Sequence, residues 1–145
     1  MDYKVGLIRK KYLLILIFVL IIITLCGCST KEYNYSIVAQ DVYLEGERMR
    51  GTSPSAIDVE LVLNDKSVKS GVDVTLHHFG TRYHGTVKGN GSMNWDNNPV
   101  LVADATYKSS KIENYNSGIK ITYNYSIFYK GTYLDCKVIQ TFSQK

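Results

Sequence analysis

Hydrophobic and polar residues alternate along most of the chain after residue 34, and this period of two predicts β-strands rather than helices. In the strand expected over residues 35–44, Val38, Val42 and Leu44 alternate with polar positions. Residues 100–103 are apolar on both faces, which is typical of a central strand. No stretch beyond residue 34 shows a convincing 3.6-residue period, so we expect an all-β domain.

Segments rich in Gly, Asn and Pro separate these alternating runs and mark turns. About seven short strands, with a turn roughly every 8–12 residues, are typical of an antiparallel β-sandwich. A small closed β-barrel is the alternative architecture, because it uses the same alternation. We expect one such domain over residues 35–145.

The turn residues give a register for the last hairpin of the chain. If Gly131-Thr132 forms a two-residue turn, Tyr129 lies opposite Leu134 and points to the core with its neighbours on that face. A slip of one residue would set apolar against polar side chains throughout the hairpin. The two faces are therefore well specified.

A second hairpin places two histidines together. With Gly80-Thr81 as the turn, His77 lies opposite His84, with their Cβ atoms about 5 Å apart. Two imidazoles could hold Zn²⁺ or Cu²⁺, but a catalytic zinc needs a third protein ligand. The alternative is a solvated histidine pair. We therefore expect neither a metal nor a cofactor, and His77 and His84 are the only metal-site candidates.

The formal charge of +4 has a local source. Four basic residues and Asp2 lie in the first 27 positions, and the rest of the chain carries 13 basic and 12 acidic residues, scattered singly. Binding to nucleic acid needs clustered Lys and Arg that neutralise several phosphates. We therefore expect no nucleic-acid partner.

The N-terminal segment has the order of an export signal. A short basic region precedes an apolar run over residues 12–25, which is shorter than the roughly 20 residues of a membrane span. The run leads into Leu25-Cys26-Gly27-Cys28. This tetrapeptide resembles the lipobox of bacterial lipoproteins. The resemblance covers residues 1–28 only, and implies cleavage between Gly27 and Cys28 with a diacylglyceryl group on the Cys28 thiol.

These features predict a chain that is anchored by lipid to the bacterial cell membrane and faces away from the cytoplasm. Residues 1–27 would be the signal peptide and residues 28–34 a short tether. An uncleaved anchor helix and ordinary signal cleavage are the alternatives. The abundance of Ile, Lys, Asn and Tyr favours a Gram-positive host.

The cysteine count predicts a domain without an internal disulfide. With Cys26 in the leader and Cys28 acylated, Cys136 is left without a disulfide partner. The domain must therefore be stable by packing alone. Because Cys136 alternates with Leu134 and Val138, we interpret it as a buried small hydrophobe rather than a nucleophile.

No catalytic motif is present, so we assign no catalytic residue. Trp95, Tyr107 and Tyr115 are candidate binding residues, with a structural role in the strands and core as the alternative. The sequence favours a non-enzymatic binding or interaction module for an envelope protein, peptide or glycan. A hydrolase of envelope polymers or a metal-dependent enzyme using His77 and His84 is one alternative. An immunity-type lipoprotein that intercepts a toxin is another.

Overall fold

The structure is a computed structural model that describes residues 31–49 and 58–145. The expected all-β, antiparallel fold is confirmed. No helix within these two ranges is long and apolar enough to cross a membrane. Their nine strands are β1 (Tyr33–Leu44), β2 (Glu47–Met49), β3 (Val59–Leu63), β4 (Asp73–His78), β5 (Thr81–Val87), β6 (Met93–Trp95), β7 (Ala105–Tyr115), β8 (Gly118–Tyr129) and β9 (Thr132–Gln144).

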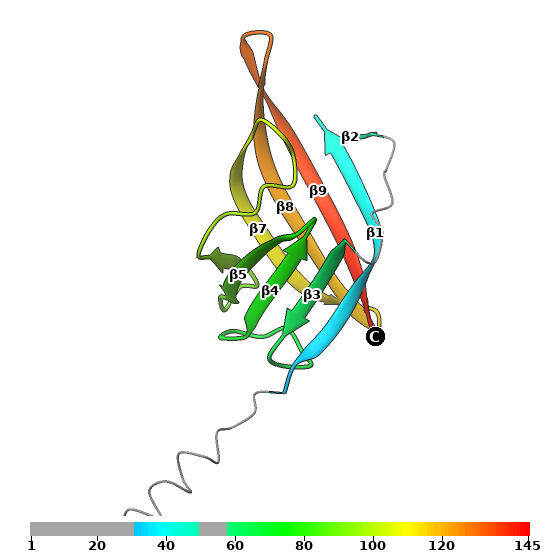
Figure 1. Cartoon of the computed structure of the whole chain (residues 1–145). Helices are drawn as coiled ribbons and strands as arrows, with labels where there is room; N and C mark the ends of the chain where they lie inside the picture. The colour runs from blue at the N-terminus through cyan, green and yellow to red at the C-terminus, as the bar shows by residue number, and fades with distance from the viewer. Residues whose placement is uncertain (1–30, 50–57) are drawn as a thin grey trace, which may run out of the picture. The chain divides into compact units, whose positions relative to one another are not determined.

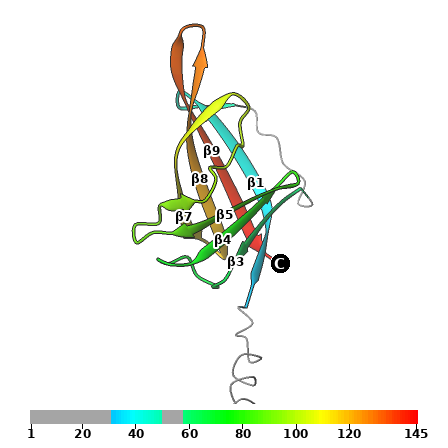
Figure 2. The same cartoon turned by 60° about the vertical axis from the view of Figure 1, so that its left-hand side comes forward.

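All nine strands belong to one sheet in the order β6-β5-β4-β3-β1-β9-β8-β7, with β2 paired to β1 off this path. Consecutive strands pair within two meanders, the short β3–β6 and the long β7–β9, and β1 lies between β3 and β9 and joins the two (Figures 1 and 2). An isolated bridge joins Ser92, the residue before β6, to Lys111 on β7. The sheet is therefore an up-and-down barrel that is nearly closed.

Of the two architectures expected from the sequence, the barrel alternative is the one found. The expected central strand at residues 100–103 is wrong, because this segment lies in the loop between β6 and β7, and Val100 is exposed. The first strand begins at Tyr33 rather than at residue 35. Hydrophobicity alone did not distinguish a strand from a loop that contributes apolar side chains to the end of a barrel.

Both expected hairpin registers are wrong by two residues, although the faces are right. Ile127 rather than Tyr129 lies opposite Leu134. The β8–β9 turn is Lys130-Gly131, with φ of 47° and 83°. The β4–β5 turn is Phe79-Gly80, and both of its residues also have positive φ. Positive φ at both central positions is the type I′ arrangement, which favours Gly in the second position. A two-residue slip keeps every side chain on its face, so alternation could not detect it.

A β-bulge in β1 explains another departure from simple alternation. The register with β9 shifts between Ile37 and Ala39, so two successive residues of β1 oppose one on β9. Val38 is therefore exposed, contrary to the expectation that it alternates with Val42 and Leu44 on one face. Beyond the bulge Val42 and Leu44 pack against the core as expected.

The interior of the barrel is a packed core that draws residues from β1 and from β3 to β9. Two polar groups in it have no hydrogen-bond partner among the described residues, the Tyr123 hydroxyl and the Gln140 Oε1. Gln140 donates its Nε2 proton to Gln40 Oε1 at 2.8 Å. All the residues of this core lie within the compact unit Lys31–Lys145.

Three expectations fall outside the described residues. The signal peptide of residues 1–27, its cleavage after Gly27 and the acylation of Cys28 all concern positions before Lys31. They remain predictions from the sequence.

Candidate functional site

The barrel has two ends with different connections, which we call proximal and distal. The proximal end carries Lys31 and Lys145 together with the loops 64–72, 88–92 and 116–117. The distal end carries the turns 45–46, 79–80 and 130–131 and the loop 96–104. In both views the β8–β9 hairpin extends past the other strands at the distal end (Figures 1 and 2).

The projecting part of this hairpin, Phe128–Tyr133, is the hairpin tip. The pairing of β7 with β8 ends at Ala105 and Ile127, and the pairing of β1 with β9 ends at Leu44 and Cys136. Beyond these pairs the tip is two strands wide, and no third strand from residues 31–49 or 58–145 pairs with either outer backbone edge. Free edges and a protruding turn are accessible to a partner.

The tip concentrates exposed aromatic side chains. Phe128, Tyr129 and Tyr133 are 60, 54 and 72% exposed, respectively. Phe128 and Tyr133 are cross-strand partners whose ring centroids lie 4.9 Å apart at an interplanar angle of 53°. Tyr129 belongs to the opposite face, and the Lys130 Nζ lies 5.2 Å from the centroid of its ring. The tip thus presents aromatic surface on both faces.

Exposed apolar side chains favour the distal end more widely. Eight large hydrophobic residues are exposed in the described part of the chain. Six of them belong to the distal end or to β2 beside it: Met49, Phe79, Val100, Phe128, Tyr129 and Tyr133. Single exposed apolar residues are ordinary, but a group at one end marks an interaction surface.

The base of the tip is held by polar contacts. The Lys108 Nζ lies 2.7 Å from the Asp135 Oδ1, which ties β7 to β9. The backbone N–H of Glu45 donates to the Asp135 carbonyl at 2.9 Å, and the Glu45 carboxylate accepts the backbone N–H of Asp135. These bonds fix the point from which the tip projects.

Two of the expected binding residues, Trp95 and Tyr107, lie in the interior instead. Trp95 is 8% exposed, and its indole Nε1 donates to the Ser110 Oγ at 2.8 Å. Tyr107 is half-buried, and its hydroxyl lies 2.9 Å from the same oxygen. A Cβ at Gly85 would lie 2.8 Å from the Trp95 ring, so the missing side chain leaves room for the indole. Trp95 thus fills the gap between β6 and β7.

Tyr115 and Tyr129 are both exposed, but they lie at opposite ends of the barrel. Tyr115 is 42% exposed, but it lies at the proximal end, where the Lys120 Nζ stands 4.6 Å from its ring centroid. Tyr129 was expected in the core, and that expectation is wrong because the hairpin continues beyond the rest of the barrel. The structure therefore does not bring Trp95, Tyr107 and Tyr115 together into one surface.

The cross-strand histidine pair is also wrong. The register sets His77 opposite Arg82 and His84 opposite Thr75. His84 instead lies beside Asp96, with its Nδ1 3.1 Å from the Oδ2, and both side chains are more than half exposed. No group of three or more His, Cys, Asp or Glu residues in ranges 31–49 and 58–145 is arranged to hold a metal ion.

Cys136 is buried, as expected, with 3% of its surface exposed. Burial raises the pKa of its thiol, because the charged thiolate would lose its hydration. The thiol is therefore protonated at neutral pH and a poor nucleophile. Its position on β9, opposite Tyr125, gives it a packing role.

No family model, curated protein or solved structure matches this chain. The arrangement of its own residues therefore carries the functional argument. Sequence reasoning missed Phe128 and Tyr133, although one signal was available. The apolar residues of segment 127–134 occupy consecutive positions on both sides of a Lys-Gly turn, whereas a strand with one buried face alternates.

Proposed function

We propose that this protein is a membrane-anchored lipoprotein outside the cytoplasm whose barrel is a non-enzymatic binding module. Its hairpin tip contacts an envelope protein. The observation that carries the proposal is the group of three exposed aromatic side chains on a hairpin that projects beyond the barrel. Phe and Tyr side chains bury a large area at a low cost in side-chain entropy, and aromatic residues dominate the energetics of interfaces.

A protein suits the tip better than a glycan. Sugar binding needs polar side chains that converge on one aromatic ring, whereas the tip offers aromatic rings on both faces and one charged side chain, Lys130. Rings on two faces fit between apolar surfaces of a folded protein, and the free strand edges add backbone donors and acceptors. Lys31 precedes β1 at the end of the barrel opposite the tip, so an anchor at Cys28 would leave the tip accessible.

The anchor and the contact surface can be tested separately. Metabolic labelling with a clickable fatty acid should mark the wild-type chain and leave Cys28→Ala unlabelled. Equal labelling of the two would refute the anchor. This result would say nothing about the tip.

Photo-crosslinking tests the tip in intact cells that make the full chain. A benzophenone amino acid at position 133 should give a discrete crosslinked protein, whereas the same probe at position 115 should not. Tyr115 is the matched control, because it is an exposed tyrosine at the proximal end. Phe128→Ser should abolish the crosslink from position 133. Equal crosslinking from both positions, or none from position 133, would contradict the proposed surface.

A further inference from the structure

Lysines gather in two pockets at the proximal end. One pocket, of about 550 Å³, is lined by Lys31, Lys66 and Lys145. The other, of about 250 Å³, is lined by Lys69, Lys88 and Lys111. Half of the twelve basic residues that the structure describes therefore lie at two openings of one end. A distribution of this kind produces a positive local potential even when the net charge of the domain is small.

Most of this positive charge is not neutralised by ion pairs. Lys145 pairs with Glu60, and Lys69 with Asp65, each at 2.5 Å. The other four lysines, Lys31, Lys66, Lys88 and Lys111, have no carboxylate partner among residues 31–49 and 58–145. Glu32 also lines the first pocket, and Glu113 in the second is paired with Lys120.

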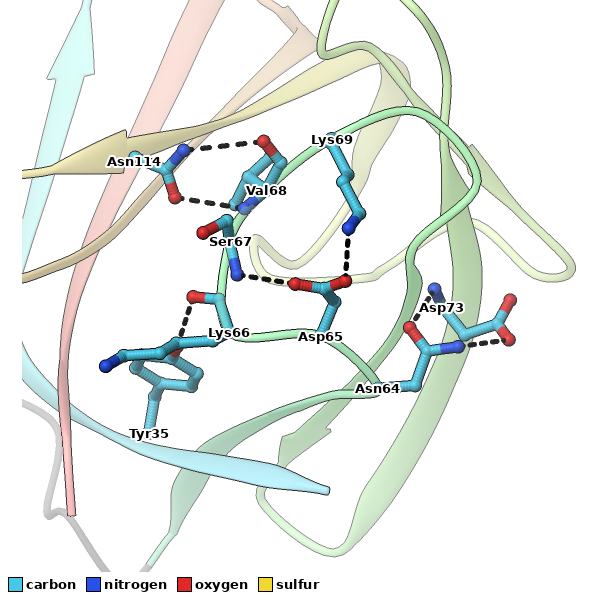
Figure 3. A network of polar contacts seen from close by, with 9 residues as sticks. All are labelled: Tyr35, Asn64, Asp65, Lys66, Ser67, Val68, Lys69, Asp73 and Asn114. Carbon is cyan, nitrogen blue, oxygen red and sulfur yellow. Dashed lines mark hydrogen bonds and ion pairs between the residues drawn. The ribbon is translucent and has the colours of Figure 1, made fainter. Parts of the chain in front are cut away.

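Hydrogen bonds fix the loop that carries Lys66 and Lys69 (Figure 3). Asn114 on β7 accepts the Val68 N–H at 3.0 Å and donates to the Val68 carbonyl at 3.4 Å. The Tyr35 hydroxyl donates to the Lys66 carbonyl at 3.1 Å. The lysines therefore extend from a backbone that is already ordered, which lowers the entropy that binding would cost.

The turn between Lys88 and Ser92 is fixed in the same way. The N–H of Lys88 donates to the Ser92 carbonyl at 2.8 Å, and the N–H of Gly91 donates to the Lys88 carbonyl at 2.9 Å. Gly91 has a φ of +79°, and a Cβ there would lie 2.8 Å from the Ile112 carbonyl oxygen. Only glycine fits this turn, which closes against β7 beside Lys111.

We propose that the proximal end is a membrane-facing surface whose two lysine-lined pockets bind the headgroups of anionic phospholipids. The inference rests on the proposed anchor, which determines where this surface lies. Lys31 is three positions after Cys28, so an extended chain keeps it within about 11 Å of the acylated residue. That distance is close to the Debye length of about 10 Å at 0.1 M salt, so the lysines interact with the charge of the bilayer.

Vesicle binding tests the proposal without the acyl chain. The protein is residues 28–145 with Cys28→Ser, which retains the whole compact unit Lys31–Lys145. We expect it to sediment with vesicles that contain phosphatidylglycerol but not with vesicles of phosphatidylcholine alone. Raising the ionic strength from about 0.05 M to about 0.3 M should release it.

Two charge-matched triple variants locate the surface. The proximal variant is Lys66→Gln, Lys88→Gln and Lys111→Gln, and the distal variant is Arg82→Gln, Lys130→Gln and Lys137→Gln. Each lysine near an anionic surface adds to the attraction between the protein and the vesicle. Because the proximal variant lacks three of them, it should bind vesicles about tenfold more weakly or worse. The distal variant should bind like the parent. Circular dichroism should show the same fold for all three proteins.

Three outcomes would overturn the proposal. The first is that the protein binds equally to both kinds of vesicle, and the second is that the two triple variants weaken vesicle binding equally. The third is that the protein binds inorganic phosphate but does not bind vesicles. None of them bears on fatty-acid labelling at Cys28 or on crosslinking from position 133. Failure of this inference can therefore be distinguished from failure of the proposed function.

Discussion

The two ends of the barrel differ in how their loops are held and in which side chains they expose. At the proximal end, the β3–β4 loop is fastened to β1 and β7 by side-chain hydrogen bonds (Figure 3). Lysines line two pockets at this end. At the distal end, one hairpin outgrows its neighbours, and aromatic side chains stay in solvent. A lipid surface needs only charge from a rigid end, whereas a protein partner needs apolar area that can be buried.

At the distal end, the hairpin tip extends beyond the strands that enclose the core. Below the tip, the loop 96–104 covers the barrel, with Pro99 buried and Leu101 and Val102 packed against the core. The Tyr125 hydroxyl donates to the Pro99 carbonyl at 2.8 Å and holds this loop in place. The exposed aromatic residues therefore belong to an extension of the sheet and not to an incomplete core.

The largest expected difference between the ends comes from two glycines. A Cβ at Gly118 would lie 1.9 Å from the Phe142 carbonyl oxygen, so Gly118→Ala should cost about 3 kcal/mol of unfolding free energy. Gly131 at the tip has no atom within 4 Å of such a Cβ, and only its φ of +83° opposes a side chain. Gly131→Ala should cost about 1 kcal/mol. Urea unfolding measures both, and equal losses would contradict the contrast in packing.

The next largest effect separates binding from stability at the tip. Replacing Phe128 and Tyr133 by Ser should weaken partner binding by about thirtyfold or more, which corresponds to about 2 kcal/mol. The melting temperature should change little, because both side chains are more than half exposed. Tyr115→Ser is the control and should leave affinity unchanged. A loss of stability as large as the loss of affinity would mean that the pair is structural.

Two tyrosines on the buried face of β8 should respond differently to the same substitution. Tyr125→Phe leaves the buried Pro99 carbonyl without its donor and should cost about 1–2 kcal/mol. Tyr123→Phe removes a buried hydroxyl that has no partner among the described residues, and should be neutral or stabilise by up to about 1 kcal/mol. Thermal unfolding of the two variants measures the difference. Similar destabilisation by both would show that the Tyr123 hydroxyl is hydrogen-bonded.

The sequence predicted the class of fold and the faces of the β4–β5 and β8–β9 hairpins, because an antiparallel sheet with one buried face imposes a period of two. It could not predict the register, since a two-residue slip preserves that period. The error came from the turns, where Lys130 and Phe79 adopt positive φ ahead of the glycine. The false His77–His84 pair followed from the same error.

The candidate site was harder to predict than the fold. Whether Tyr129 is buried depends on how far β1 and β7 extend beside β9 and β8, and no local pattern in the hairpin contains that information. Trp95 could have been assigned to the core only with knowledge that Ser110, on another strand, offers its oxygen. Exposure at the end of a barrel depends on the relative lengths of strands, which tertiary structure determines.

The smallest expected effect is on the pH dependence of stability, because different groups titrate at the two ends. Burial lowers the pKa of His78, on the distal end of β4, so the folded state binds this proton less readily than the unfolded chain. Its contribution to stability is complete above the ordinary histidine pKa of about 6.5, and is lost as the pH falls from there toward the lowered value.

At the proximal end, the Lys69 hydrogen bond lowers the pKa of Asp65, and the Lys120 hydrogen bond lowers that of Glu113. Their contributions are lost only below about pH 4.3. Melting curves between about pH 7 and pH 3 should show that His78→Gln flattens the upper part of this range and Glu113→Gln only the lower part. An unchanged upper slope in His78→Gln would show that another group titrates there.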